Sequence, residues 1–336
     1  MESLVGLEFW RDKKVLVTGA TGLVGSRLIQ ELLRMHCDVT GLMVELPPSS
    51  ALVTNGNIKD ITVVWGDLAD PVIVNRLINE CQFEIVFHLG AQTIVGTALR
   101  QPVQTFESNI RGTWNLLEAI RLFGSNLQSI VVASSDKAYG PSENLPYIES
   151  HALRGEGPYD VSKTCTDLIA QSYGLTYSIP VSIARCGNIY GPGDLNWSRI
   201  VPGTIKALFH NETPILRSDG KMIRDYVFID DIVSAYIALA EQQNIIKPGE
   251  AFNFSNDLPL SVTEIYNAIC LEYTGSVIEP KILNVASYEI IAQNLSSEKA
   301  HKILNWYSRY DLSSGLKMTL PWYTNLLKAG SAIAHS

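Results

Sequence analysis

The sequence predicts an α/β protein built on a doubly wound parallel sheet, with a smaller, discontinuous C-terminal lobe. Three observations support this prediction. The first half alternates short β-rich segments with longer amphipathic segments of helical period. The predicted strands are apolar on both faces, which is typical of a parallel sheet covered by helices on each side. The length of 336 residues suits one large α/β unit with a second lobe.

The predicted elements follow one another in strand and helix order. The sheet strands share a short apolar run and are expected at residues 13–19, 37–45, 61–67, 83–91, 129–135 and 180–191. The amphipathic helices are expected at residues 23–35, 109–124 and 161–177. A short strand with a helix is expected within residues 226–243, and one more sheet strand at 250–255.

A glycine-rich turn joins the first predicted strand to the first predicted helix. In "VTGATGLVGS", Gly19, Gly22 and Gly25 follow the pattern GxxGxxG. Glycine permits the tight turn, lets the backbone approach a pyrophosphate and lets the helix pack on the strand. The exposed N–H groups and the helix dipole then favour the anion. The strand-before and helix-after context favours Rossmann-type dinucleotide binding over a plain tight turn.

The composition changes after Gly187. Residues 188–204 are rich in Gly, Pro and Asn and predict a loop into a second lobe, while residues 260–327 predict small helices and strands. We therefore expect two discontinuous parts. The dinucleotide-binding domain comprises residues 1–186 and about 224–256, and the substrate-binding lobe comprises about 187–223 and 257–330.

Composition and charge exclude several classes of protein. The net charge of −8 argues against a nucleic-acid surface, although a local arginine cluster can still bind an anionic ligand. The five scattered cysteines indicate reduced thiols in the cytoplasm, and the six histidines show no metal-ligand spacing, so no metal site is expected. We also expect no export signal and no membrane span, since no apolar run reaches about 18 residues.

Two acidic residues at predicted strand ends are candidates for contacting an adenosine ribose or adenine. Glu45 follows the second strand about 20 residues after the last glycine, where an acid favours NAD over NADP; the alternative is a solvated loop residue. Asp67 ends the third strand in "WGDLAD". Its alternative function is an N-cap for the following helix.

A tyrosine and a lysine lie one helical turn apart in "PYDVSK". Tyr159 and Lys163 are four residues apart, which places both side chains on one helix face. A nearby ammonium group favours the phenolate and lowers the phenol pKa. This spacing is also common by chance, so the pair alone does not establish a catalytic unit.

Seven segments in a fixed order resemble the extended short-chain dehydrogenase/reductases: "VTGATGLVG", "VFHLGAQ", "SNIRGTWNLLEA", "VVASSDKAYG", "YDVSK", "RCGNIYGPGD" and "IRDYVFIDD". The resemblance extends from about Phe9 to Leu327. It implies NAD as cofactor, with Tyr159 as the acid/base of hydride transfer, Lys163 holding the nicotinamide ribose and Ser135 assisting. The residues that it implies for the cofactor are Gly19, Thr21, Gly22, Leu23, Val24, Gly25, Glu45, Asp67, Leu68, Leu89, Ala91, Tyr159 and Lys163.

The fifth predicted strand ends in "SSDKAYG", which holds more polar groups than hydride transfer needs. The additional Asp136 and Lys137 resemble the acid/base pair of nucleotide-sugar 4,6-dehydratases, most closely those acting on CDP-glucose. The resemblance implies that one residue of the pair removes the C5 proton and the other protonates the departing 6-hydroxyl. Asp136 as acid and Lys137 as base is one assignment, and the reverse stays open. The simple alternative is an exposed turn.

The resemblance also implies residues that contact a nucleotide-diphosphate sugar. Arg224 matches a phosphate-gripping arginine and Asn188 a residue at the sugar diphosphate, with a surface arginine and a turn residue as alternatives. Arg199 and Arg217 are weaker phosphate or base candidates, and ordinary surface charges are their alternative. Gln92 and Asn109 match positions that line the sugar or brace the strand end.

Two features limit the choice of substrate. Inverting UDP-sugar 4,6-dehydratases usually have Met at the tyrosine position, so Tyr159 argues against that branch. Arg224-Asp225-Tyr226 departs from the Arg-Pro-Trp of CDP-glucose enzymes and is more like the dTDP-glucose and GDP-mannose branches. A GDP-, dTDP- or UDP-sugar therefore stays open.

Alternative functions within the family are an epimerase or a reductase, which would not need Asp136 and Lys137. A catalytically silent NAD-binding scaffold is a third hypothesis, against which the intact Ser135, Tyr159 and Lys163 argue. The resemblance further implies a homodimer formed through the helix containing "TWNLLEAI" and the helix carrying Tyr159; apolar residues there could instead face the sheet.

Overall fold

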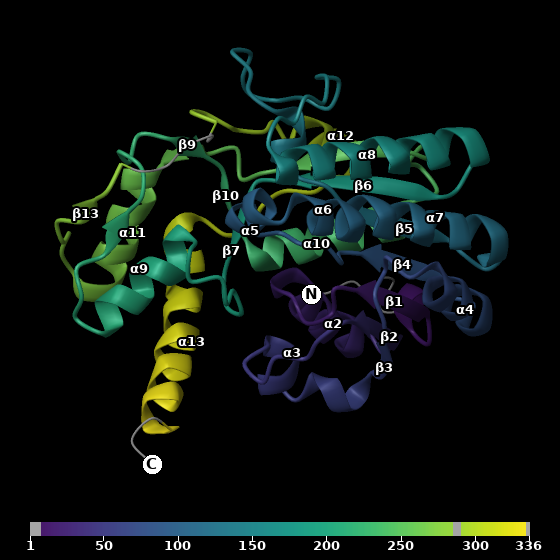
Figure 1. Ribbon diagram of the computed structural model, residues 1–336, viewed down its shortest axis with the longest axis horizontal. Coiled ribbons are helices and arrows are strands. Elements are labelled where there is room, and N and C mark those ends of the chain that lie inside the picture. The colour runs from purple at the N-terminus through teal and green to yellow at the C-terminus, as the bar shows by residue number, and fades with distance from the viewer. Residues whose placement is uncertain (1–7, 285–289, 334–336) are drawn as a thin grey trace.

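The computed structural model describes residues 8–284 and 290–333, and its centre is a seven-stranded sheet (Figure 1). The strand order is β11-β6-β5-β4-β1-β2-β3, and every neighbouring pair is parallel. The strands are β1 (Lys14–Thr18), β2 (Asp38–Met43), β3 (Thr62–Trp65), β4 (Ile85–His88), β5 (Ser129–Ala133), β6 (Val181–Cys186) and β11 (Glu250–Phe254). The order reverses between β1 and β4, so the predicted doubly wound sheet is confirmed.

Helices cover both faces of the sheet, as the apolar strands predicted. Those of the sheet region are α2 (Leu23–Arg34), α3 (Ala51–Thr54), α4 (Pro71–Cys81), α5 (Val95–Arg100), α6 (Pro102–Phe106), α7 (Gly112–Phe123), α8 (Pro158–Tyr177), α10 (Ile229–Glu241) and α12 (Glu298–Leu304). Short turns of other helical type are η1 (Asn57–Asp60), η2 (Glu107–Arg111) and η3 (Asp136–Tyr139).

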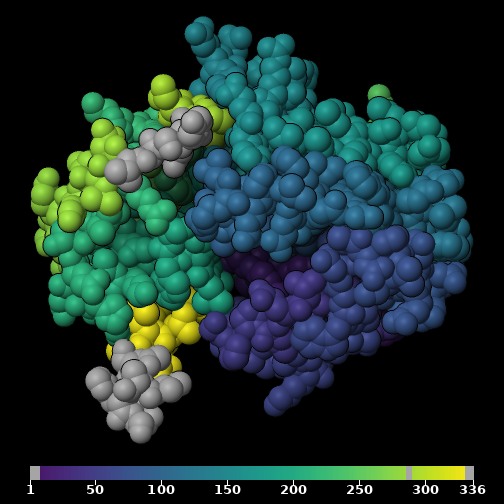
Figure 2. All heavy atoms as spheres, viewed as in Figure 1, coloured from purple at the N-terminus to yellow at the C-terminus, as the bar shows by residue number. Residues whose placement is uncertain are grey.

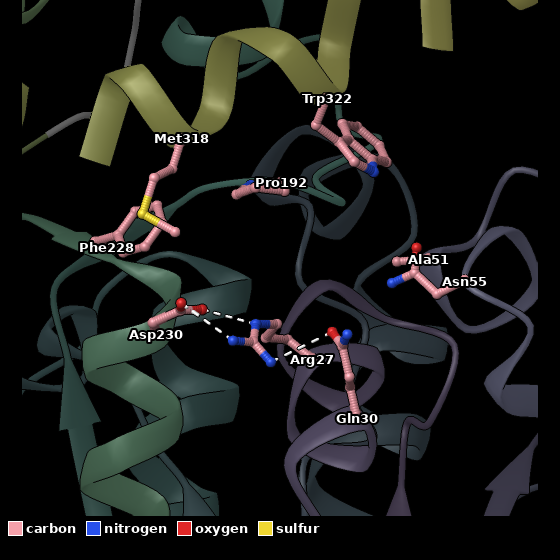
Figure 3. Close-up of a pocket in the computed structure, with 9 residues that line it drawn as sticks. All are labelled: Arg27, Gln30, Ala51, Asn55, Pro192, Phe228, Asp230, Met318 and Trp322. Carbon is pink, nitrogen blue, oxygen red and sulfur yellow. Dashed lines mark hydrogen bonds and ion pairs between the residues drawn. The ribbon is translucent and has the colours of Figure 1, made fainter. Parts of the chain in front are cut away.

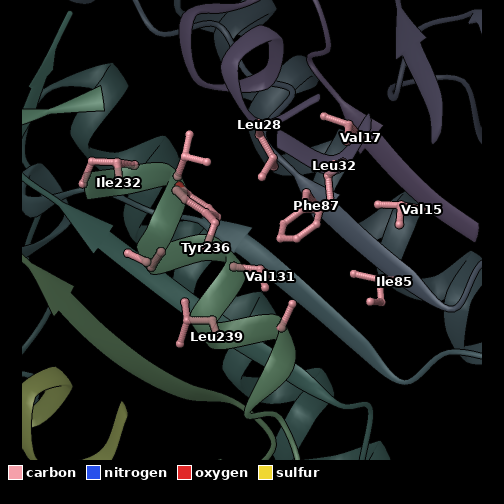
Figure 4. Packing of buried hydrophobic residues seen from close by; sticks show 14 of the residues in the cluster. Val15, Val17, Leu28, Leu32, Ile85, Phe87, Val131, Ile232, Tyr236 and Leu239 are labelled. Atoms are coloured by element: carbon pink, nitrogen blue, oxygen red, sulfur yellow. The ribbon is translucent and has the colours of Figure 1, made fainter. Parts of the chain in front are cut away.

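Two hydrophobic cores lie on opposite faces of the sheet. On one face, α2 and α10 pack against side chains such as Val15, Val17 and Phe87 (Figure 4). On the other face, α4, α7 and α8 pack against Leu16 and Val86. The alternation of Val15, Leu16 and Val17 between the two cores follows the two-residue period of a strand. Both faces of β1 are therefore buried.

A third hydrophobic core lies beside the sheet and holds the C-terminal lobe together. It is formed mainly by α9 (Ile200–Phe209), α11 (Val262–Thr274) and α13 (Leu312–Ile333), with residues of β7 (Asn188–Tyr190) and β10 (Tyr226–Phe228), which pair with each other. Two further small sheets pair β8 (Ile215–Leu216) with β13 (Lys281–Ile282), and β9 (Ile223–Arg224) with β12 (Leu260–Ser261). Figure 2 shows a hollow between this lobe, in green, and the sheet region.

Three expectations about local structure were wrong. The sixth strand was predicted to run to Gly191, but β6 stops at Cys186, and β7 belongs to another sheet. At Gly187, between the two strands, a Cβ would lie 2.7 Å from the Cβ of Asp225. Residues 200–209 form helix α9 within the predicted loop, and α13 spans 22 residues where small elements were expected. Both helices bury apolar side chains in the third core, which stabilises them against local Gly and Pro signals.

The predicted domain boundaries stay a prediction. In the part of the chain that the structure describes, no helix has the length and apolarity that a bilayer span requires. All five cysteines are free thiols.

Candidate active site

The glycine turn after β1 has the close backbone contacts that its sequence predicted. Gly19 has a φ of 69°, and a Cβ there would lie 2.8 Å from the backbone nitrogen of Gly90. A Cβ on Gly25 would lie 2.3 Å from the carbonyl oxygen of Gly19. Gly22 is the N-cap of α2 and makes no side-chain hydrogen bond to the first N–H groups of the helix. A pyrophosphate fits such a cradle of bare backbone N–H groups.

The other predicted cofactor residues follow the carboxyl ends of neighbouring strands. Glu45 is exposed two residues after β2, and Leu89 and Ala91 follow β4. Asp67 is exposed after β3, where its carboxylate accepts a hydrogen bond from the backbone nitrogen of Ala69 at 2.9 Å. Because carboxyl ends of parallel strands meet at one edge, the structure brings these segments to the same side of the sheet as the glycine turn.

The alternative function of Asp67 as a helix cap is wrong. The N-cap of α4 is Asp70, whose carboxylate accepts from the backbone nitrogen of Val72 at 2.9 Å. Leu68 is buried, and its carbonyl oxygen accepts a hydrogen bond from Asn115 Nδ2 at 2.9 Å.

The polar segment after β5 folds into a buried turn. Ser135 caps η3, and its Oγ donates to Asp136 Oδ1 at 2.9 Å and accepts from the backbone nitrogen of Lys137 at 3.2 Å. Asp136 is only 3% exposed, so the simple alternative of an exposed turn is wrong for its carboxylate. Burial of a carboxylate is costly, which makes this a strong indication of a specific role.

Tyr159 and Lys163 lie on the first two turns of α8, on the same helix face. Lys163 is buried and its Nζ donates to the carbonyl oxygen of Ala133, the last residue of β5, at 2.8 Å. Burial lowers the pKa of Lys163 to about 8. The contact joins α8 to the end of the strand that Ser135 follows.

The pKa of the Tyr159 phenol is raised above its ordinary value, whereas the Tyr–Lys spacing predicted a lowered pKa. Burial raises its pKa to about 12, and the charge of Asp136 adds to the rise. The positive charge of Arg199 and a hydrogen bond with Ser135 lower the pKa but do not outweigh burial. The direction is opposite to the predicted one, because desolvation disfavours the phenolate more than the nearby cations favour it.

Lys137 reaches a residue far away in the sequence. Its Nζ donates to Gln293 Oε1 at 3.1 Å. On the α8 side, burial raises the pKa of Asp160, the positive charge of Lys137 lowers it and Asp136 raises it. These influences and that of Asp136 on Tyr159 show that the turn after β5 and the start of α8 form one cluster. The sequence pattern missed Gln293, since no local signal links it to Lys137.

Asn109 braces the strand end. Its Oδ1 accepts from the backbone nitrogen of Gln92 at 2.7 Å, and its Nδ2 donates to the carbonyl oxygen of Gln92 and to Ser162 Oγ, each at 2.9 Å. Ser162 Oγ in turn donates to the carbonyl oxygen of Tyr159 at 2.7 Å. The buried amide of Asn109 is thus used in fixing backbone, which favours its structural alternative. Gln92 follows β4, and its backbone is the part of it that Asn109 binds.

A buried histidine that the sequence pattern did not single out extends this network. His88, at the end of β4, lies between Thr18 Oγ1 and Thr113 Oγ1, each 3.0 Å from one ring nitrogen. Burial and the charge of Lys163 lower its pKa to about 3, so the ring is neutral. Thr18 Oγ1 also accepts from the backbone nitrogens of Leu89 and Gly90. The network therefore links β1, β4 and α7.

The predicted substrate residues differ in their surroundings. Arg224 is buried on β9, and its Nη1 donates to the carbonyl oxygen of Ile223 at 2.7 Å, so the surface alternative is wrong for it. Arg199 pairs with Asp194 at 3.0 Å, with its side chain 38% exposed, and its charge acts on Tyr159. Asn188 begins β7, half-buried. Arg217 is exposed, as its surface alternative predicts.

A separate pocket of about 180 Å³ lies between the sheet region and α13 (Figure 3). At its floor, Arg27 of α2 binds Asp230 of α10 through two hydrogen bonds of 2.7 and 3.1 Å. Its lining residues are Arg27, Gln30, Ala51, Asn55, Pro192, Phe228, Asp230, Met318 and Trp322. None of them is a predicted site residue.

The parallel sheet with a glycine turn after its first strand defines a Rossmann-type fold, and comparison with known proteins identifies the family of this chain. Residues 15–255 match the NAD dependent epimerase/dehydratase family, and the chain belongs to this family. The membership confirms NAD as the cofactor and confirms the resemblance to extended short-chain dehydrogenase/reductases.

Individual relatives include both dehydratases and epimerases. The chain is 28% identical to CDP-glucose 4,6-dehydratase of Salmonella typhimurium, over 95% of this chain and 93% of that protein. It is 26% identical to human dTDP-D-glucose 4,6-dehydratase, over 93% and 90% of the two chains. The structure of UDP-glucose 4-epimerase from Thermotoga maritima superposes with a TM-score of 0.84 at 26% identity, covering 94% of this chain and 99% of that one. The protein is therefore an enzyme of the nucleotide-sugar dehydratase and epimerase family.

Proposed function

We propose that this protein is a nucleotide-sugar 4,6-dehydratase that converts CDP-glucose to CDP-4-keto-6-deoxyglucose and water, a lyase with tightly bound NAD. The observation that carries the proposal is the buried acid/base turn after β5. Asp136 and Lys137 lie in one cluster with Ser135 and Tyr159, and epimerization or simple reduction needs no such additional pair.

The first half of the proposed reaction oxidises C4. Tyr159 takes the proton of the 4-hydroxyl, and Ser135, which hydrogen-bonds the phenol, holds the sugar oxygen in line. Lys163 anchors the nicotinamide ribose from its position on Ala133. NAD, when bound, accepts a hydride from C4 and later returns it to C6. Since burial raises the pKa of Tyr159 to about 12, its use as a base depends on nearby positive charge, and the charge of Arg199 acts in that direction.

The second half removes water across C5 and C6. The C4 ketone acidifies the C5 proton, which Lys137 accepts as base, while Asp136 protonates the departing 6-hydroxyl. The atoms balance, because Lys137 takes one proton from C5, Asp136 gives one proton to the departing hydroxyl to form water, and the protonated Lys137 returns a proton to C5 when C6 receives the hydride. Asp136 is placed for the acid role by its position, since its buried carboxyl lies on the same turn as Ser135 and directly before Lys137. The exchanged assignment, with Lys137 as acid, remains a variant of the same proposal.

The substrate assignment rests on Arg224 and on similarity. The buried guanidinium of Arg224 is suited to a diphosphate, and Asn188 and Arg199 lie on the neighbouring segments β7 and the start of α9. The CDP-glucose enzyme of Salmonella typhimurium is the relative that supports the cytidine base. Arg224-Asp225-Tyr226 supports the dTDP-sugar alternative.

A nucleotide-sugar 4-epimerase is the second candidate, favoured by the superposition on the Thermotoga maritima epimerase. The test is incubation with CDP-, dTDP-, GDP- and UDP-hexoses and NAD, followed by mass spectrometry and absorbance. Loss of one water to give a 4-keto-6-deoxy sugar supports the dehydratase. A product of unchanged mass and inverted C4 supports the epimerase, and no change with any hexose contradicts both.

We further propose that the enzyme is a cytoplasmic homodimer. α7 and α8 pack on each other and leave Trp114, Leu168 and Leu175 exposed on their outer sides. The free thiols fit a reducing compartment. Light scattering should give twice the chain mass for the wild type and a single chain mass for Leu168→Glu with Leu175→Glu. A monomeric wild type contradicts the dimer.

A further inference from the structure

The turn after β5 contacts a residue far along the chain, Gln293. The contact is made by the amine of Lys137. The side chain of Gln293 is fully buried, and its Oε1 accepts the hydrogen bond from Lys137 Nζ at 3.1 Å. The two residues are 156 positions apart in the chain. A buried amide held against the amine of a proposed acid/base residue is more specific than ordinary core packing.

The backbone around Gln293 is tied down on both sides. Its nitrogen donates to the carbonyl oxygen of Ile223 on β9 at 3.0 Å. The nitrogen of Leu295 donates to Asp225 Oδ2 at 2.6 Å, and the carbonyl oxygen of Asn294 accepts from the nitrogen of Tyr147 at 2.8 Å. The position of the amide is therefore set by the strands that carry Arg224, and by the segment that follows η3.

The oxygen end of the amide is the end that Lys137 contacts. The amide nitrogen, Nε2, is buried and has no hydrogen-bond partner among the described residues. Gln293 also acts on Tyr147: burial raises the pKa of that phenol to about 12, and Gln293 lowers it. The Tyr147 hydroxyl donates to the carbonyl oxygen of Gly140.

The neutral amide suits an amine that must change its charge. A carboxylate at this distance would favour the ammonium form and raise its pKa, whereas an amide oxygen accepts a hydrogen bond from either form. The charged groups of this cluster are Asp136 on the same turn as Lys137, Asp160 on α8, on which the charge of Lys137 acts, and Arg224 on β9, whose charge acts on Tyr147.

We propose that Gln293 is a positioning residue for the water-elimination step, which holds the Lys137 amine in place through its carbonyl oxygen without adding a charge. The inference deepens the proposed dehydratase function and rests on it for the kinetic consequence. It also links the lobe that would bind the diphosphate to the acid/base pair.

The contact is tested first without substrate. Lys137 is acetylated in the NAD-loaded protein over a range of pH, and the modified peptide is quantified by mass spectrometry for the wild type, Gln293→Glu and Ser296→Ala. Ser296 lies on the same segment. Its hydroxyl accepts a hydrogen bond from the backbone nitrogen of Glu298, at an exposed position, so Ser296 is the matched control. Gln293→Glu is expected to raise the apparent pKa of Lys137 by about 1 or more. Identical titration curves for the wild type and Gln293→Glu would overturn the proposal.

The kinetic consequence is tested by separating the two halves of the reaction. Gln293→Leu is expected to slow water loss by about 10- to 100-fold while C4 oxidation stays within about 3-fold of the wild type. Equal losses in both steps would indicate general structural damage and overturn the positioning role. If the wild type removes no water from any nucleotide hexose, the proposed function fails, and the titration still decides whether Gln293 acts on Lys137.

Discussion

Ser135 Oγ donates a hydrogen bond to the carboxylate of Asp136 at 2.9 Å, so the hydroxyl that we propose to assist hydride transfer is joined directly to the proposed acid of the elimination. The same hydroxyl hydrogen-bonds the phenol of Tyr159. One short turn thus connects the two halves of the proposed reaction. This connection allows predictions that separate them.

Removal of the Asp136 acid should stop the elimination and spare the oxidation. Asp136→Asn keeps the shape but cannot protonate the departing 6-hydroxyl, so water loss should fall by about 100- to 10,000-fold. Stopped-flow absorbance should still show reduced cofactor, and a 4-keto hexose should accumulate. Asp60→Asn, at an exposed position, is the control. Wild-type water loss in Asp136→Asn would contradict the role.

Removal of the Tyr159 phenol should stop both halves. Tyr159→Phe lacks the group that takes the 4-hydroxyl proton, so reduced cofactor should form at least about 100-fold more slowly than in the wild type. Tyr177→Phe, at the exposed end of the same helix, is the matched control and should behave as the wild type. Unchanged C4 oxidation in Tyr159→Phe would refute the assignment.

Gly25 of the glycine turn should tolerate no side chain. In Gly25→Ala the new Cβ would lie 2.3 Å from the carbonyl oxygen of Gly19, so the backbone must shift where the pyrophosphate approaches. We expect about 10-fold or greater loss of NAD affinity, measured by calorimetry on protein stripped of nucleotide. Gly96→Ala meets its nearest atom at 3.6 Å and should bind NAD normally. Equal affinities for the two variants would contradict the turn's function.

Asp225 should make stability depend on pH. Burial raises its pKa to about 7, above the ordinary 3.8, so at intermediate pH it keeps a proton in the folded state that the unfolded chain has lost. Below about pH 4, Asp225 is protonated in both states and does not change the free energy of unfolding. As the pH rises from 4 toward 7, the raised pKa of Asp225 lowers the free energy of unfolding progressively.

Asp225→Asn removes this titration. The wild type should lose stability relative to the variant between pH 4 and 7, by up to about 4 kcal/mol in urea unfolding. Asp219→Asn, at an exposed position nearby, should show no such trend. A constant difference between the wild type and Asp225→Asn across this range would contradict the raised pKa.

Local patterns predicted most of the sheet. β1, β4 and β6 are buried on both faces and therefore consist of apolar runs that are visible in the sequence. The turn from Gly19 to Gly25 was predictable because its backbone contacts leave no room for a Cβ at Gly19 or at Gly25. α13 was not predicted, because its packing against α9 and α11 outweighs the Gly and Pro residues within it.

The candidate site was predictable only where its residues are close in sequence. Ser135, Asp136 and Lys137 lie on one turn, and Tyr159 and Lys163 on one helix, so spacing and family resemblance brought them together. The contact of Lys137 with Gln293 depends on how the lobe folds back. The raised pKa of Tyr159 depends on burial, which spacing does not show.

Transfer of deuterium within the substrate tests the central claim most directly. CDP-glucose labelled with deuterium at C4 is incubated with the NAD-loaded enzyme, and the product is analysed by NMR and mass spectrometry. The proposed function predicts a 4-keto sugar that has lost one water and carries the label in its C6 methyl group. Label that remains at C4 of an epimerised sugar, with the 6-hydroxyl retained, would contradict the dehydratase.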